Sequence, residues 1–106
     1  METLHTLAAT PTRRVLLVLD PDHRPEYGLD SPEETEAAER HERAMLDSGE
    51  WAALGLIVEE SCPHCGAWEH VDSVWGVVVE STYPDDAFVH GLVTDHLGWT
   101  AETLAA

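Results

Sequence analysis

Lysine is absent from this chain of 106 residues, and arginine occurs only five times. Against these five cations stand 21 aspartates and glutamates, so the formal net charge is −16. Nucleic acids and anionic membrane surfaces are bound through cations that neutralise phosphate, so direct binding to either is disfavoured. We expect a protein partner with a basic surface; the alternative is that the charge provides only solubility.

Long apolar runs are also absent, since none approaches the ~20 residues of a membrane-spanning helix. Residues 1–12 lack the basic region and long apolar stretch of a secretory signal, so we expect a cytoplasmic protein. Hydrophobic residues make up 43% of the chain, enough for one modest core, and the length fits a single domain over residues 1–106. Only two cysteines are present, and in the cytoplasm a metal half-site or simple thiols are more common than a stable disulfide.

The sequence contains no glycine-rich phosphate loop and no recognisable setting for a serine nucleophile, so we do not expect an enzyme. Asp20, Asp22 and His23 follow a predicted strand, and catalytic groups are common at such positions. An acidic loop is the commoner explanation for them. The remaining alternative, an uncharacterised metal or thiol enzyme, predicts a pocket that joins the cysteines or several of the seven histidines.

The first predicted elements are a strand and a helix. Residues 13–20 read RRVLLVLD, and this unbroken apolar run indicates a strand buried on both faces. A loop over residues 20–30 then leads to Ser31, which is placed to cap a helix that begins at Pro32 and ends near Gly49. On a helical wheel the core-facing side carries Ala37, Ala38, His41, Ala44 and Met45. The opposite, solvated face carries Glu36, Glu39, Arg40, Glu42, Arg43 and Asp47.

Two strand-like stretches follow, residues 54–61 and 70–80, and they predict an antiparallel hairpin with the cysteines at its tip. A symmetric register places Gly55 opposite Gly76 and Leu56 opposite Trp75, which suggests a bulge or a close backbone approach. A second helix should begin near Asp85 and end at Gly98. The predicted fold is therefore α+β, a small antiparallel sheet in the order β-α-β-β-α with both helices on one face. The uncovered face predicts a homodimer or a partner.

Residues 62–66 read Cys-Pro-His-Cys-Gly, a turn that can present two thiolates to one tetrahedral zinc. The spacing continues to His70 and so matches three ligands of a retroviral-type zinc knuckle, but the expected fourth cysteine is replaced by Trp75. The candidate zinc ligands are therefore Cys62, Cys65, His70 and His64, with other histidines, Asp72 or a second subunit as further donors. Reduced thiols in a tight turn and redox activity are the alternatives.

Two hydrophobic segments carry a resemblance to a known group of proteins. Residues 49–59 read GEWAALGLIVE and residues 72–76 read DSVWG, and an acidic helix follows them. In this pattern the chain resembles small acidic accessory proteins encoded by actinobacterial phages and related mobile elements. The resemblance implies a phage accessory factor, and no mechanism. Together with the charge, it leads to the hypothesis of a non-enzymatic protein that binds a host protein, in one version by nucleic-acid mimicry. A zinc-binding structural module organised by the cysteine turn is the alternative.

Overall fold

The structure is a computed structural model that describes residues 2–24, 27–80 and 84–106. Residues 25 and 26, within the predicted loop, lie outside this description. In chain order the elements are β1 (Thr3–Thr10), β2 (Arg13–Leu19), α1 (Pro32–Ser48), β3 (Ala52–Ser61), β4 (Trp68–Val79), α2 (Asp86–Leu97) and α3 (Ala101–Ala105). Within the described residues, none of the helices combines the length and apolar character needed to cross a bilayer.

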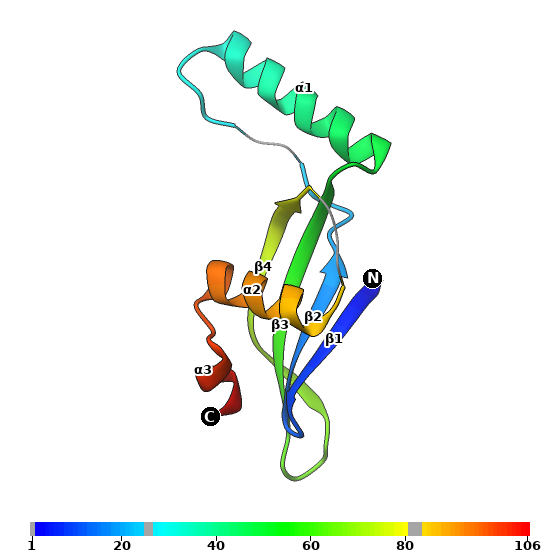
Figure 1. The fold of residues 1–106 in the computed structure, drawn as a ribbon, viewed down its shortest axis with the longest axis vertical. Helices are drawn as coiled ribbons and strands as arrows, with labels where there is room; N and C mark the ends of the chain where they lie inside the picture. Colours follow the sequence, from blue (N-terminus) through cyan, green and yellow to red (C-terminus); the bar gives the residue numbers. More distant parts are fainter. Residues whose placement is uncertain (1, 25–26, 81–83) are drawn as a thin grey trace.

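The four strands form one antiparallel sheet in the order β1-β2-β3-β4 (Figure 1). The α+β class is confirmed, but the order differs from the prediction because β1 had not been expected. The sequence of β1 is TLHTLAAT, and Leu7 is its only fully buried residue. Such a mixed segment has little hydrophobic signal of its own, and it becomes a strand by pairing with β2.

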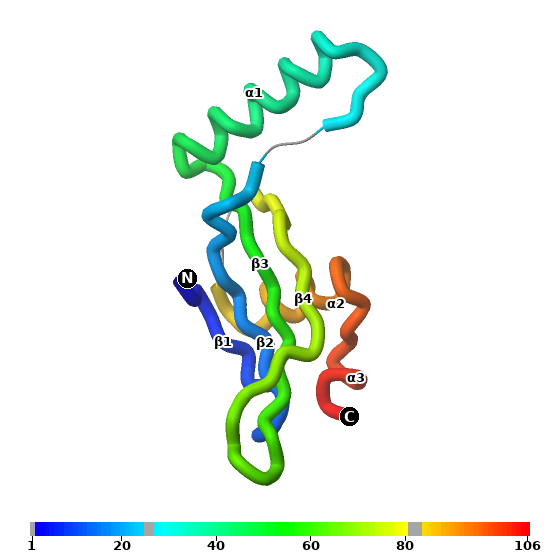
Figure 2. The backbone as a smooth tube through the Cα atoms, turned by 180° about the vertical axis from the view of Figure 1, so that it is seen from behind, coloured from blue at the N-terminus to red at the C-terminus, as the bar shows by residue number. Residues whose placement is uncertain are grey.

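The hydrophobic core lies between one face of this sheet and the last two helices. Leu17, Leu56, Val93 and Leu104 are completely buried there. Figure 1 shows α2 lying across the sheet, and the view from behind in Figure 2 shows the strands in front of it. In the part of the chain that the structure describes, no helix lies over the opposite face of the sheet.

Arg13, at the start of β2, binds the C-terminal helix α3 and so connects it to the sheet. Its guanidinium contacts Glu60 and lies 5.3 Å from the ring centroid of Trp99. Its Nη1 donates to three carbonyl oxygens at 2.9–3.1 Å, those of Thr103, Leu104 and Ala106. A cation at the carbonyl end of a helix is favoured by the helix dipole as well as by the hydrogen bonds.

The helix α1 has the predicted ends but not the predicted position. Ser31 caps it, with its Oγ accepting from the N–H of Glu34 at 3.0 Å, and Gly49 ends it with a φ of 81°. The helix does not lie on the sheet face beside α2, as predicted, but extends beyond the end of the sheet (Figure 1). It therefore lacks the apolar surface that would have buried its alanines.

The face of α1 that contacts the rest of the protein is also different from the predicted one. Glu42, expected in solvent, is its one buried residue, while Ala37, His41 and Ala44 are exposed. The rings of His41 and Trp51 lie perpendicular to each other, with 5.4 Å between their centroids. The wheel prediction was wrong because it assumed an apolar environment for the helix, whereas α1 packs against a polar loop.

The predicted glycine-rich irregularity between β3 and β4 is a bulge. Leu54 pairs with Val77 but Leu56 pairs with Val74, so the predicted symmetric register fails at this level. Gly76 has a φ of 72°, and the ring of Trp75 lies directly over Gly55, where a Cβ atom would overlap it. The bulge thus turns a tryptophan onto the uncovered face of the sheet.

Candidate functional site

Polar contacts, partly buried, hold the loop after β2 against the β4 bulge. Asp20 accepts from two backbone N–H groups, that of Gly76 at 3.0 Å and that of Asp22 at 3.2 Å. The ring of His23 lies 3.1 Å from the position that a Cβ atom of Gly76 would occupy. The carboxylate of Asp20 therefore has a structural role, because it joins the loop to the sheet.

The same loop surrounds the buried carboxylate of α1. The hydroxyl of Tyr27 donates to Glu42 at 3.2 Å, and the Tyr27 backbone N–H donates to Glu39 at 3.2 Å. His23 Nε2 is 3.5 Å from the other Glu42 oxygen and, within the described residues, is a buried atom without a hydrogen bond. Burial, and then the charge of Glu42, raise the pKa of the Tyr27 hydroxyl.

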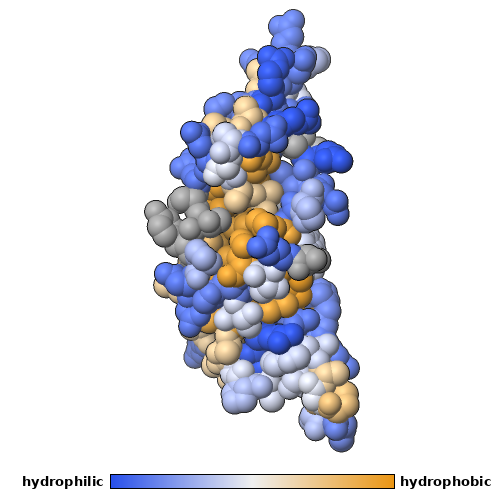
Figure 3. All heavy atoms as spheres, turned by 90° about the vertical axis from the view of Figure 1, so that its right-hand side faces the viewer, coloured by the Kyte–Doolittle hydropathy of each residue, from blue (hydrophilic) through white to orange (hydrophobic). Residues whose placement is uncertain are grey.

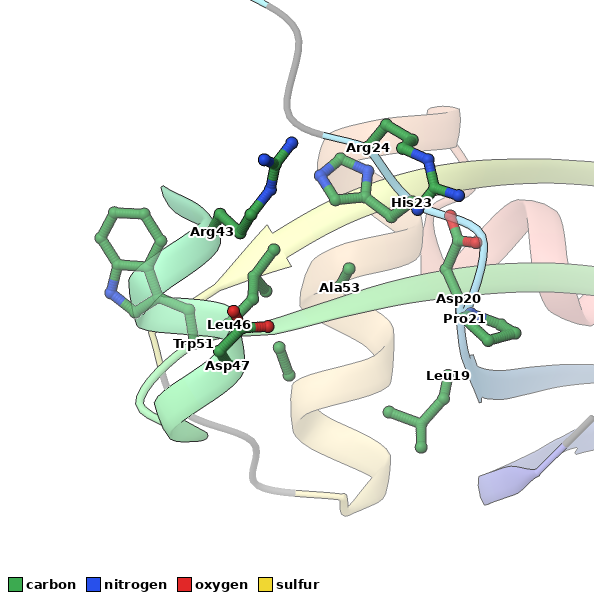
Figure 4. A pocket seen from close by; sticks show the side chains of 11 residues that line it. Leu19, Asp20, Pro21, His23, Arg24, Arg43, Leu46, Asp47, Trp51 and Ala53 are labelled. Atoms are coloured by element: carbon green, nitrogen blue, oxygen red, sulfur yellow. The ribbon is translucent and has the colours of Figure 1, made fainter. Parts of the chain in front are cut away.

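A cavity of about 650 Å³ opens between α1, the loop and the first residues of β3 (Figure 4). Its lining includes charges of both signs, from Arg24, Arg43, Asp20 and Asp47. The other three arginines form ion pairs with glutamates, but Arg24 and Arg43 form none with any residue that the structure describes. The cavity thus offers guanidinium and carboxylate groups to a polar ligand or side chain, and it contains one histidine and neither cysteine.

The sheet face opposite α2 and α3 carries partly exposed apolar side chains. Leu16 and Ile57 are cross-strand partners there and are half-buried, and Trp75 is 43% exposed. Towards the hairpin tip, the guanidinium of Arg14 lies 4.0 Å from the centroid of the Trp68 ring and binds Glu59 at 2.9 Å. Figure 3, seen from the β1 side, shows apolar side chains gathered in the middle of the molecule and hydrophilic ones over α1.

At the far end of β3 the two cysteines lie in the predicted tight turn. The N–H of Gly66 donates to the carbonyl of Cys62 at 2.9 Å, and the N–H of Cys62 donates to the carbonyl of Ala67 at 2.6 Å. Gly66 has a φ of 72°, which glycine adopts without strain. Backbone N–H groups of Cys65 and His64 lower the pKa of the Cys62 thiol, as does the neighbouring thiol of Cys65.

The structure brings together two of the four predicted zinc ligands. Cys62 and Cys65 lie in one tight turn, which the hydrogen bond from the N–H of Gly66 to the carbonyl of Cys62 closes. His64 is exposed in the same turn, while His70 lies on β4 with its Nε2 3.0 Å from Ser73 Oγ. In the described part of the chain, which includes the whole turn, no three cysteine, histidine or acidic residues form a group able to hold a metal. A single chain therefore presents a two-thiol half-site.

The contact between Tyr27 and Glu42 was not found from the sequence. Glu42 is one of several charged residues on a helix, and nothing in its neighbours marks it as buried. The one usable signal was the cluster of Asp20, Asp22 and His23 after a strand, which does belong to this region. Comparison with protein-family models, with curated proteins and with solved structures finds no match, so the function is inferred from the geometry alone.

Proposed function

We propose that this protein is a non-enzymatic acidic binding protein that attaches to a basic surface of a partner protein. The observation that carries the proposal is the position of α1, which extends beyond the sheet and presents carboxylates to solvent. The exposed acids on and beside this helix are Asp30, Glu33, Glu34, Glu36, Asp47 and Glu50. A helix that projects in this way carries its carboxylates away from the sheet, where the basic surface of a partner can reach them.

The uncovered sheet face supplies the apolar contacts that a specific complex needs. Charge directs association and excludes wrong partners, but tight binding depends on a few desolvated anchors, among which tryptophan is common. Trp75 is 43% exposed beside the half-buried Leu16 and Ile57. The proposed interface therefore combines the acidic end of α1 with an apolar centre around Trp75.

A binding role accounts for the arrangement better than a thiol enzyme does. The cavity lies at the first residues of β3 and the cysteines follow its last residue. Ten strand residues span roughly 33 Å, so the thiols and the cavity residues cannot act on one small substrate. The proposal agrees with the phage accessory role that the sequence resemblance implies, and nucleic-acid mimicry is its narrower version.

The test is affinity capture from an actinobacterial lysate with the full chain and two variants of equal net charge. One variant carries Glu33→Gln, Glu34→Gln and Glu36→Gln on α1. The control variant carries Glu69→Gln, Asp95→Asn and Glu102→Gln, three exposed acids distant from α1 in the sequence. Capture is repeated across a range of salt concentrations, and Trp75→Ala is included to test the apolar centre.

We expect a basic protein that is retained by the wild type and by the control variant, but lost with the α1 variant and at high salt. Equal loss with both triple variants would show simple ion exchange and would refute a specific site on α1. Duplex DNA that displaces the captured protein would support mimicry. Simultaneous binding of DNA and this chain to that protein would exclude it.

A further inference from the structure

The cysteine turn lies at one end of a long molecule, separate from the proposed binding surface. The principal extents are 54 × 26 × 23 Å, and Figure 1 places α1 and the β3–β4 turn at opposite ends of the long axis. Cys65 and the residues around it are exposed. Among the described residues, the hydrophobic core contains none from this turn, so burial in the core does not account for its two cysteines.

The geometry of the turn is that of half a metal site. Cys62 and Cys65 lie three positions apart in one tight turn, in which the N–H of Gly66 donates to the carbonyl of Cys62 and Cys65 is exposed. Two sulfurs on one tetrahedral zinc lie roughly 3.8 Å apart when each Zn–S bond is about 2.3 Å, and two cysteines separated by two residues in a turn can supply such a pair. The left-handed Gly66 closes the turn, and the N–H of Cys62 donates to the carbonyl of Ala67 across it.

A structural zinc ion needs four ligands, and this chain supplies two at the turn. His70 is directed to Ser73 instead. A second copy of the same chain can supply the missing pair, since a two-fold axis through the metal would bring an identical half-site to the other side. The exposed turn leaves room for this approach, and a contact between the tips keeps the two acidic α1 helices at the distant ends of the dimer.

We propose that Cys62 and Cys65 of two chains bind one zinc ion and join the chains tip to tip. The site is a tetrahedral zinc tetrathiolate that is incomplete in the monomer. Each bound zinc displaces the protons of the four thiols, which pass to the solvent, and no oxidation takes place. This inference is independent of the proposed basic partner and concerns a different end of the molecule.

The experiment is a titration of the reduced full-length chain with zinc sulfate in a phosphine reductant, followed by sedimentation equilibrium and metal analysis. We expect the mass to double as zinc reaches one ion per two chains, and excess chelator to restore the monomer. The double variant Cys62→Ser/Cys65→Ser should stay monomeric at every zinc concentration. His70→Asn is the matched control and should dimerise like the wild type.

Cobalt provides a second readout of the ligands, because a tetrahedral tetrathiolate site gives intense thiolate-to-metal bands. Zinc bound at one ion per chain without association would overturn the proposal, as would the loss of binding in His70→Asn. Absence of any zinc binding by a chain that is folded by circular dichroism would overturn it too. A dimer that forms without zinc, or survives chelation in reductant, would place the contact elsewhere.

Discussion

Replacement of Arg13 by lysine should release the C-terminal helix α3. The guanidinium of Arg13 binds two parts of the protein. Its Nη1 donates to three carbonyl oxygens of the C-terminal residues, and its other nitrogens donate to Glu60. A lysine ammonium is a point donor on a flexible stem and cannot reproduce this fork. The side chain of Arg13 is only 16% exposed, so water does not readily replace the lost contacts.

The size of the change in the free energy of unfolding depends on which contacts of Arg13 are lost with lysine. Hydrogen bonds to charged groups contribute about 1.5–3 kcal/mol each, and lysine should keep some of them. The ion pair adds little, because Glu60 is 44% exposed and its charge is screened by solvent. We therefore expect Arg13→Lys to lower the free energy of unfolding by about 2 kcal/mol, which for a domain of this size corresponds to a fall in Tm of roughly 10 °C.

The assay is urea unfolding followed by circular dichroism, with hydrogen exchange of the α3 amides as a local measurement. Arg40→Lys is the control, since Arg40 and Glu36 are 71% and 73% exposed and a change of at most about 0.5 kcal/mol is expected. If Arg13→Lys is as stable as the control and exchange in α3 is unchanged, the burial of Leu104 alone holds the helix, and the reasoning above is wrong.

Three further predictions concern single side chains. Gly55→Ala places a methyl group against the Trp75 ring and should lower the free energy of unfolding by about 1–3 kcal/mol, measured in urea. The control Gly91→Ala in α2 meets open space and should raise the free energy of unfolding by up to about 1 kcal/mol. Equal effects of the two substitutions would contradict the close approach of Trp75 to Gly55. The raised pKa of Tyr27 means that the folded state holds this proton more tightly, so stability should be lost as pH rises above the ordinary value of 10.0, and Tyr27→Phe should reduce that loss. The lowered pKa of Cys62 predicts that its alkylation by iodoacetamide has a midpoint below pH 9.0, measured by peptide mass spectrometry; a midpoint at or above pH 9.0 would refute it.

In the candidate sites, the features that could be predicted from the sequence are those that depend only on residues adjacent in the chain. The cysteine turn was predicted because four residues and a glycine determine its hydrogen bonds, and the structure places both cysteines in that turn. The role of His70 as a zinc ligand stays a prediction. Within one chain its ring nitrogen lies 3.0 Å from the hydroxyl of Ser73 and not beside the cysteines. The bulge was predicted from Gly55 and Gly76, but its register was not, because pairing depends on both strands at once.

The sequence by itself determined where the helices begin and end and where the chain reverses. Ser31 and Gly49, and likewise Asp85 and Gly98, satisfy backbone groups within a few residues of themselves, so their effect is independent of the rest of the fold. Only the tertiary structure decided the pairing of β1, the projection of α1 and the burial of Glu42. Each of these depends on contacts between segments distant in the chain, and the hydrophobic pattern of one segment does not contain that information.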